Sequence, residues 1–190
     1  MTDSEHLATL QRHWKQHRSF PAAAQVGEVL RLDSSEVFGL LSRLGEAGYL
    51  QRAGARLEPG RAFFARPLLG TVRAGLPQPA SQERAETLTL DDYLIDRPDR
   101  TSLHRVRGDS MVDAGILEGD LVVVEHQSST KAGDIVLAVV DGELTVKTLS
   151  VDAQGAPVLL PANAAYPTIV PSGSLEILGV VVSVVRRLRR

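Results

Sequence analysis

The sequence contains no cysteine, no long apolar run and no leader-like N-terminus, and each absence excludes a class of protein. Without cysteine the chain forms no disulfide and offers no thiolate to a metal, so we expect a reducing, cytoplasmic location. We also expect no metal and no cofactor. No run of 18 apolar residues occurs, so no membrane span is expected. The most apolar stretch, LEILGVVVSVV, is short and β-branched and predicts a buried strand. The first residues, MTDSEHLATL, are polar and acidic, unlike a secretory signal.

Length and charge allow two domains with different roles. The chain has 190 residues, 43% of them apolar, which suits a small domain beside a medium one. Residues 1–66 carry nine lysines and arginines against seven acidic residues, whereas residues 67–190 carry twelve against sixteen. The formal charges are therefore +2 and −4, a distribution that permits nucleic-acid contact at the front.

Residues 1–57 have the pattern of a winged helix-turn-helix domain. EHLATLQRHWKQHR and PAAAQVGEVL are typical of helices, the second opened by Pro21. A third helix is predicted after Asp33, because Glu36 three residues later completes a capping box, and Gly48 ends it. YLQRAGARLE then predicts two short strands around Ala53–Gly54. Three helices followed by a small hairpin is the order of a winged helix-turn-helix.

We expect the third helix to be the recognition helix for DNA. Serines contact phosphates or bases, and a phenylalanine ring packs on a thymine methyl group. The candidate contacts are the outward residues Ser34, Ser35, Phe38, Ser42 and Arg43. Arg52 and Arg56 flank the expected wing and suit backbone phosphates. Two alternatives stay open: Phe38 is also compatible with a core position, and the whole domain with protein contacts.

A linker and a β-rich domain are expected behind this domain. Residues 58–70, EPGRAFFARPLLG, hold two prolines and two glycines and are assigned to the linker. From Leu103 onward, short β-branched runs alternate with turns, namely LVVVEH, DIVLAVV, ELTVKTLS, PVLLP and LEILGVVVSVV. Asp141–Gly142 between two of them is a strong hairpin signal. Residues 71–190 are therefore predicted to form a barrel-like β domain, which makes the chain an α+β multidomain protein.

One serine of the β domain has the setting of a nucleophile. Ser110 follows a Gly–Asp turn in HRVRGDSMVDAG, where the backbone N–H groups of Ser110 and Met111 are placed to stabilise an oxyanion. Residues 107–109 also match the Arg-Gly-Asp adhesion signal, which we take as a chance match because that signal requires an extracellular protein. A serine hydroxyl needs a base. Of the five histidines only His104 is near in the sequence, and no acidic partner for it is evident.

Lys147 is the better candidate for the base. Strand alternation in ELTVKTLS places Lys147 with Thr145 and Leu149 on one face, and a lysine inside an apolar strand is unusual. A lysine amine is normally charged and accepts no proton. Burial lowers its pKa, and a neutral Lys147 would form a Ser–Lys dyad with Ser110. The alternative is an edge-strand lysine that points to solvent.

These motifs resemble the LexA/UmuD family of self-cleaving proteins. The resemblance rests on GDSM followed by GILEGDLVVVE, on GDIVLAVVDGELTVKTL and on LLPANAAYPTIVP, and it covers residues 68–183. It implies a LexA/signal-peptidase-type domain with Ser110 as nucleophile and Lys147 as base. By the same resemblance, LLGTVRAGLP is the substrate segment, cut between Ala74 and Gly75 of the same chain. Small residues suit that bond, since an alanine fits a tight pocket and a glycine lets the chain turn.

The resemblance and the front domain together imply a repressor of a DNA-damage (SOS-type) response. We expect a homodimer on a two-fold operator, with cleavage stimulated by a RecA–single-stranded-DNA filament. Arg73 and Asp109 depart from the best-known LexA proteins, which affects the expected cleavage rate and trigger. The alternatives are a UmuD-like accessory factor for translesion synthesis, whose front domain binds protein, and a peptidase that acts on other chains. The tail RRLRR is expected to be a solvated end, with phosphate contact as its alternative.

Overall fold

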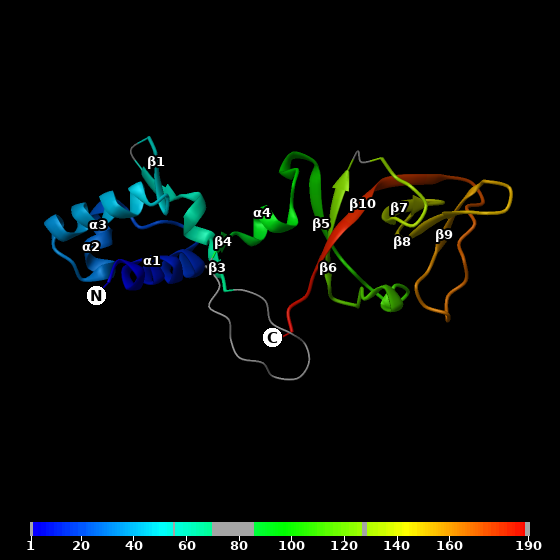
Figure 1. Ribbon diagram of the computed structural model, residues 1–190, viewed down its shortest axis with the longest axis horizontal. Coiled ribbons are helices and arrows are strands. Elements are labelled where there is room, and N and C mark those ends of the chain that lie inside the picture. Colours follow the sequence, from blue (N-terminus) through cyan, green and yellow to red (C-terminus); the bar gives the residue numbers. More distant parts are fainter. Residues whose placement is uncertain (1, 55, 70–85, 127–128, 189–190) are drawn as a thin grey trace. The chain divides into compact units, whose positions relative to one another are not determined.

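A computed structural model describes residues 2–54, 56–69, 86–126 and 129–188. The chain divides into two compact units, residues 1–93 and 94–190, and each is described by itself (Figure 1). The first unit is mainly helical and the second is mainly β. This confirms the expected α+β class, with a small helical unit followed by a β-rich one.

The front unit has the predicted order of three helices and a hairpin. It contains α1 (Asp3–His17), α2 (Ala23–Leu30), α3 (Ser34–Glu46), β1 (Leu50–Ala53) and β2 (Arg56–Pro59). At the start of α3, the Asp33 carboxylate accepts from the backbone N–H groups of Ser35 and Glu36, and Glu36 accepts from Asp33 N–H in return. This is the capping box that the sequence predicts. Gly48 follows the helix with φ of 74°, the left-handed conformation that ends many helices.

The core of the front unit extends beyond residue 57, the end predicted for this domain. A short 3₁₀ helix, η1 (Arg61–Phe64), places Phe63 in the helical core with only 1% of its surface exposed. The Phe63 ring meets Trp14 and Phe20 edge-on, at centroid distances of 6.4 and 6.2 Å. Residues 58–64, assigned above to the linker, therefore pack as part of this unit.

A second hairpin follows η1 in the same unit. Strand β3 (Arg66–Leu68) pairs with β4 (Glu86–Leu88) in an antiparallel register, and α4 (Leu90–Leu94) comes next. Arg61 of η1 binds Asp92 of α4, with a nitrogen–oxygen distance of 2.9 Å. The segment between β3 and β4 includes Ala74 and Gly75, which lie outside the described residues.

The second unit is built on one six-stranded antiparallel sheet with the order β5-β6-β10-β7-β8-β9. Its strands are β5 (Thr101–Arg105), β6 (Leu121–His126), β7 (Ile135–Val140), β8 (Glu143–Val151), β9 (Pro157–Leu160) and β10 (Leu175–Val185). Two 3₁₀ helices accompany them, η2 (Pro98–Arg100) and η3 (Val112–Ala114). The five predicted runs are β6 to β10, whereas β5 went unrecognised as a strand. The C-terminal strand β10 lies between β6 and β7, which joins the two halves of the sheet (Figure 1).

The predicted hairpin between β7 and β8 is present. Asp141 and Gly142 form its tip with φ of 49° and 90°, the pair of left-handed residues that a tight type I′ turn requires. The Asp141 carboxylate accepts from backbone N–H groups of Ser172, Gly173 and Ser174, which lowers its pKa to about 2. The hairpin tip is thus fixed to the loop before β10.

Part of the C-terminal segment RRLRR packs on the second unit, and part of it is exposed to solvent. Arg186 binds the Asp120 carboxylate at 2.6 Å and also donates to the carbonyl of Gly115. Asp120 is 2% exposed, and the arginine holds the pKa of its carboxyl below the ordinary value. Leu188 is 93% exposed, and residues 189–190 lie outside the description. The first arginine of RRLRR is therefore a structural partner rather than part of a solvated end.

Candidate active site

Ser110 lies on the turn that leaves strand β5. Gly108 has φ of 81°, which lets the chain reverse just before the serine. Met111, directly after it, is 3% exposed and packs in the core with Ile116 and Val122. The bend at Gly108 and the packing of Met111 together hold the Ser110 hydroxyl at the surface of this core.

Lys147 extends from strand β8 to that serine. Its Nζ lies 2.8 Å from Ser110 Oγ, 3.0 Å from Thr145 Oγ1 and 2.9 Å from the carbonyl oxygen of Val146. The lysine residue is only 7% exposed, so the alternative of a solvent-pointing edge lysine does not hold. The two residues singled out from the sequence, 37 positions apart, are in direct contact.

The environment of Lys147 favours its neutral form. Burial lowers the pKa of its amine from the ordinary value of 10.5. Its three hydrogen-bond partners are two hydroxyls and a carbonyl, none of which carries a negative charge. A neutral amine satisfies this set by donating to Thr145 and Val146 and accepting from the Ser110 hydroxyl. The arrangement suits a base that takes a proton from Ser110.

The backbone N–H groups of Ser110 and Met111 are open to a ligand. Within the described parts of the chain, neither group donates a hydrogen bond to protein. The carbonyl groups on the same peptide units are engaged, since Asn163 Nδ2 donates to Asp109 O and Ala162 N donates to Ser110 O. Two free donors beside a hydroxyl are what an oxyanion site requires.

A cavity of about 290 Å³ opens beside these groups. Both Ser110 and Lys147 line it, together with apolar side chains from several elements, including Val106, Met111, Ile116, Leu137, Leu144 and Val146. This volume lies at the small end of ligand pockets. His104, Arg105, Arg107 and Thr145 complete a lining that is polar as well as apolar, and the limited volume favours small side chains.

His104 lines the cavity but belongs to a separate hydrogen-bond chain. Its Nε2 lies 2.8 Å from Ser102 Oγ, which lies 2.6 Å from Nε2 of His126. His126 Nδ1 in turn lies 2.8 Å from the carbonyl oxygen of Leu178. None of these contacts includes Ser110, so among the described residues Lys147 is the one basic side chain in contact with the serine hydroxyl.

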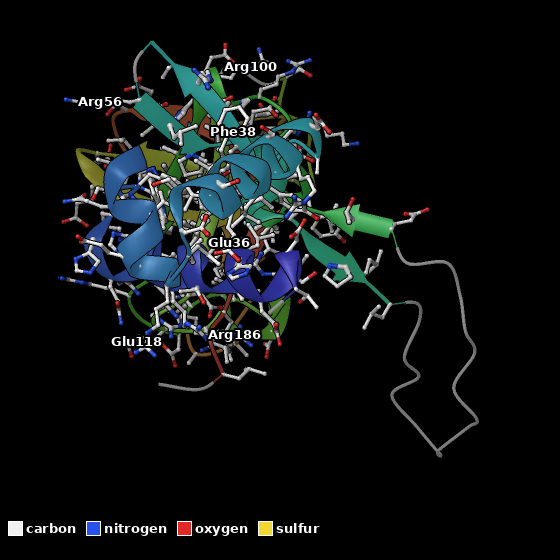
Figure 2. The ribbon with its side chains drawn as sticks, turned by 90° about the vertical axis from the view of Figure 1, so that its left-hand side faces the viewer. Glu36, Phe38, Arg56, Arg100, Glu118 and Arg186 are labelled. Carbon is white, nitrogen blue, oxygen red and sulfur yellow. The ribbon has the colours of Figure 1, made fainter. Side chains whose placement is uncertain are left out.

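In the front unit, the predicted DNA contacts fall on two sides of α3. Phe38 is 72% exposed, which excludes the core position considered above. It lines a groove of about 450 Å³ with Ser42, Arg52 and Arg56, between α3 and the β1–β2 hairpin. Figure 2 shows Phe38 on the part of α3 near this hairpin, which carries Arg56.

The other side of α3 faces α1. Arg43 forms a two-pronged ion pair with Asp3, with nitrogen–oxygen distances of 2.7 and 2.9 Å. Ser35 and Arg43 line a different, smaller groove, and Ser34 is exposed at the first turn of the helix. Helical spacing predicts Arg43 as an outward residue, but it does not reveal a partner 40 residues away.

Sequence reasoning missed two polar residues of the site, Asn163 and Tyr166. Asn163 donates to the Asp109 carbonyl at 3.0 Å, and the Tyr166 hydroxyl donates to the Asp109 carboxylate at 2.5 Å. Both lie in LLPANAAYPTIVP, one of the segments on which the resemblance rests. The available signal was that this largely apolar segment between prolines contains an asparagine and a tyrosine, both able to form hydrogen bonds.

Fold and site together define a serine-peptidase-type domain behind a helical unit, and comparison with known proteins agrees. Residues 67–182 match the family described as Peptidase S24-like. The chain belongs to this family, among its LexA-like repressors. It is 34% identical to the LexA repressor of Caldicellulosiruptor saccharolyticus over 195 residues, covering 97% of this chain and 95% of that protein.

Two further relatives differ in the extent of the match. The LexA repressor of Opitutus terrae is 40% identical over 154 residues, which cover 79% of this chain and 76% of that protein. Protein SamA of Salmonella typhimurium is 45% identical over 116 residues, 61% of this chain and 81% of that protein. No helix of the described residues is long and apolar enough to cross a membrane.

Proposed function

We propose that this chain is a cytoplasmic, DNA-binding repressor of a DNA-damage response that inactivates itself by cutting its own Ala74–Gly75 bond. The observation that carries the proposal is the 2.8 Å contact between Ser110 Oγ and the buried amine of Lys147. Membership of the Peptidase S24-like family and the LexA relatives support it.

The proposed reaction is an acyl transfer followed by hydrolysis. Lys147 takes the hydroxyl proton while Ser110 Oγ attacks the carbonyl carbon of Ala74. The resulting oxyanion accepts hydrogen bonds from the N–H groups of Ser110 and Met111. Lys147 then returns the proton to the amine of Gly75 as the peptide bond breaks. Water hydrolyses the ester on Ser110 and restores the serine.

The cut falls within the front unit and would weaken operator binding by separating its helical part from the second unit. It leaves β3 in one fragment and β4 in the other, joined by a ladder of three residue pairs and by the exposed Arg61–Asp92 ion pair, which adds little. A two-stranded ladder of this size is marginal by itself in water. Once the connection is cut, the fragments also lose their mutual effective concentration. A front fragment without the second unit would bind as a single weak module, whereas the intact protein would bind a two-fold operator as a homodimer.

Purified protein incubated at alkaline pH is expected to yield two fragments, residues 1–74 and 75–190. The rate is expected to rise as pH rises through the pKa of Lys147, because only the neutral amine accepts the proton. Below that pKa the rate should fall about tenfold per pH unit. Since burial lowers this pKa, the rise begins at a lower pH than for an exposed lysine. Fragment masses against pH test this, and a pH-independent rate would contradict it.

Folding stability follows the same titration. Because the pKa of Lys147 is lower in the folded state, the free energy of unfolding is highest above the unfolded pKa of this lysine. It decreases as pH falls from there toward the folded pKa.

A RecA–single-stranded-DNA filament is expected to stimulate cleavage at neutral pH. Arg73 and Asp109, which depart from the best-known LexA sequences, are expected to affect the rate of this stimulated cleavage.

For the DNA-binding function, Arg52→Ala and Arg56→Ala are each expected to weaken binding about tenfold at 0.1 M salt. Both arginines line the groove beside α3, and each lost phosphate contact removes roughly one unit of the salt dependence of binding. A gel-shift titration on the chain's own promoter, at several salt concentrations, measures both quantities. Arg12→Ala, an exposed arginine of α1, is the matched control. Equal losses in all three variants would contradict an interface at the groove.

A second function, a UmuD-like accessory factor whose front unit binds protein, is favoured by one observation. Phe38 is 72% exposed in the groove beside the hairpin, where apolar surface serves a protein partner as well as DNA. Intact self-cleavage together with no binding to its own promoter would support this function over repression.

A further inference from the structure

The segment after β9 holds the turn that carries Ser110. Ala162 N donates to the Ser110 carbonyl at 2.8 Å, and Asp113 N donates to the Ala162 carbonyl at 2.8 Å. Asn163 Nδ2 donates to the Asp109 carbonyl at 3.0 Å. The amide orientation of Asn163 is consistent, because its Oδ1 accepts from Ala165 N at 3.0 Å. Both carbonyl groups flanking the nucleophile are thus bound by this segment, and the Asp109 carbonyl also accepts from Val112 N at 3.1 Å within the turn itself.

These contacts fix the direction of the two free N–H groups. In a trans peptide unit the C=O and N–H bonds are coplanar and point in opposite directions. The Asp109 carbonyl shares a unit with the Ser110 N–H, and the Ser110 carbonyl shares one with the Met111 N–H. Holding each carbonyl toward residues 162–163 therefore aims each N–H the opposite way. Both N–H groups lack a protein acceptor in the described parts of the chain.

We infer that Asn163 is a positioning residue for cleavage: by binding the Asp109 carbonyl, it orients the Ser110 N–H toward the oxyanion. The inference rests on the proposed self-cleavage. The backbone N–H of Ala162 orients the Met111 N–H in the same way, because it binds the Ser110 carbonyl of the same peptide unit. Asn163 itself does not line the cavity and touches neither Lys147 nor the Ser110 hydroxyl.

Tyr166 adds a second hold on the same turn. Its hydroxyl donates to Asp109 Oδ1 at 2.5 Å, and the adjacent carboxylate raises the pKa of the tyrosine. Asp109 is absent from the cavity wall, although Gly108 and Ser110 on either side line it. A carboxylate turned toward the oxyanion would oppose the developing charge. Tyr166 keeps the Asp109 carboxylate away from the cavity, which accommodates this departure from the best-known LexA sequences.

The test is the full pH profile of self-cleavage for the full-length chain with Asn163→Ala. The rate on the alkaline plateau is expected to fall about 30-fold, somewhat less than the loss of a whole oxyanion donor. The pH of half-maximal rate should stay unchanged, because the contacts of Lys147 are intact. Thr168→Ala, an exposed residue of the same segment, should leave rate and profile unchanged. Tyr166→Phe, which removes a single hydroxyl, should lower the plateau about fivefold with the same midpoint.

The possible results distinguish a failure of the positioning role from a failure of the proposed self-cleavage. An unchanged plateau in Asn163→Ala, or a shifted midpoint, would overturn the positioning role while wild-type cleavage stands. If Asn163→Ala does not fold, an unchanged plateau in Tyr166→Phe overturns the hold on the turn, and the expected fall supports it. Absence of cleavage in the wild-type chain would overturn the proposed function and this inference with it.

Discussion

Lys147→Met is expected to abolish self-cleavage at every pH while the protein stays folded. Methionine has nearly the length of lysine and fills the same space without an amine, so Ser110 loses its base. Loss of one member of such a unit typically lowers the rate by at least about 10³-fold. Replacing a buried amine that has no anionic partner by an apolar side chain is also expected to leave the unfolding temperature unchanged or raised.

Ser110→Ala completes this test and should fail to the same extent. Lys131→Met is the matched control, because Lys131 is an exposed lysine of the same unit. Fragment formation on denaturing gels, followed over the alkaline range, gives the rates, and thermal unfolding verifies the fold. Fragments that persist in both Lys147→Met and Ser110→Ala would show that another group, or a contaminating protease, makes the cut. Loss of cleavage in Lys131→Met would point to an effect of charge alone.

Much of the site could be predicted because its signals are local. The Asp–Gly tip and the alternation in ELTVKTLS place Lys147 on a strand face with Thr145, and in the structure the Thr145 hydroxyl lies 3.0 Å from the lysine amine. The contact with Ser110 was beyond local reasoning. It depends on the sheet order, in which the last strand, β10, lies between β6 and β7. Strand pairing over that separation is set by the whole core.

In the segment assigned to the linker, local signals led to an assignment that differs from the observed packing. Prolines and glycines in residues 58–70 predict breaks, but two phenylalanines lie between them, and one fills the helical core. Turn residues mark where the chain bends and say nothing of what the bend packs against. The same limit applies to Arg43, whose partner Asp3 comes from another helix. Asn163 and Tyr166 escaped detection because their partners are atoms of a distant turn.

Gly179→Ala is expected to destabilise the second unit strongly, because this glycine pairs with both neighbouring strands and a side chain there would meet their atoms. Strand β10 pairs with both β6 and β7 at Gly179, and its register with β7 shifts there. A Cβ atom at this position would lie 2.5 Å from the Glu125 carbonyl oxygen and 2.8 Å from a methyl group of Val124. Backbone atoms of a central strand cannot give way locally, so we expect a loss of about 3 kcal/mol. For a domain the size of the second unit that corresponds to roughly 12–24 °C in unfolding temperature.

The chain offers an internal reference for that measurement. Its single tryptophan, Trp14, packs on Phe63 in the front unit, so tryptophan fluorescence follows that unit. Circular dichroism in the β region follows the second. Gly179→Ala should lower the β transition and leave the fluorescence transition in place, whereas Ser183→Ala in the same strand should change neither. Because β7 leads directly into β8, a displaced β10 also loosens the position of Lys147, and cleavage should slow well below the new transition. An unchanged β transition would mean that β6 yields to the added methyl, and that the close approach at Gly179 is not needed for the sheet.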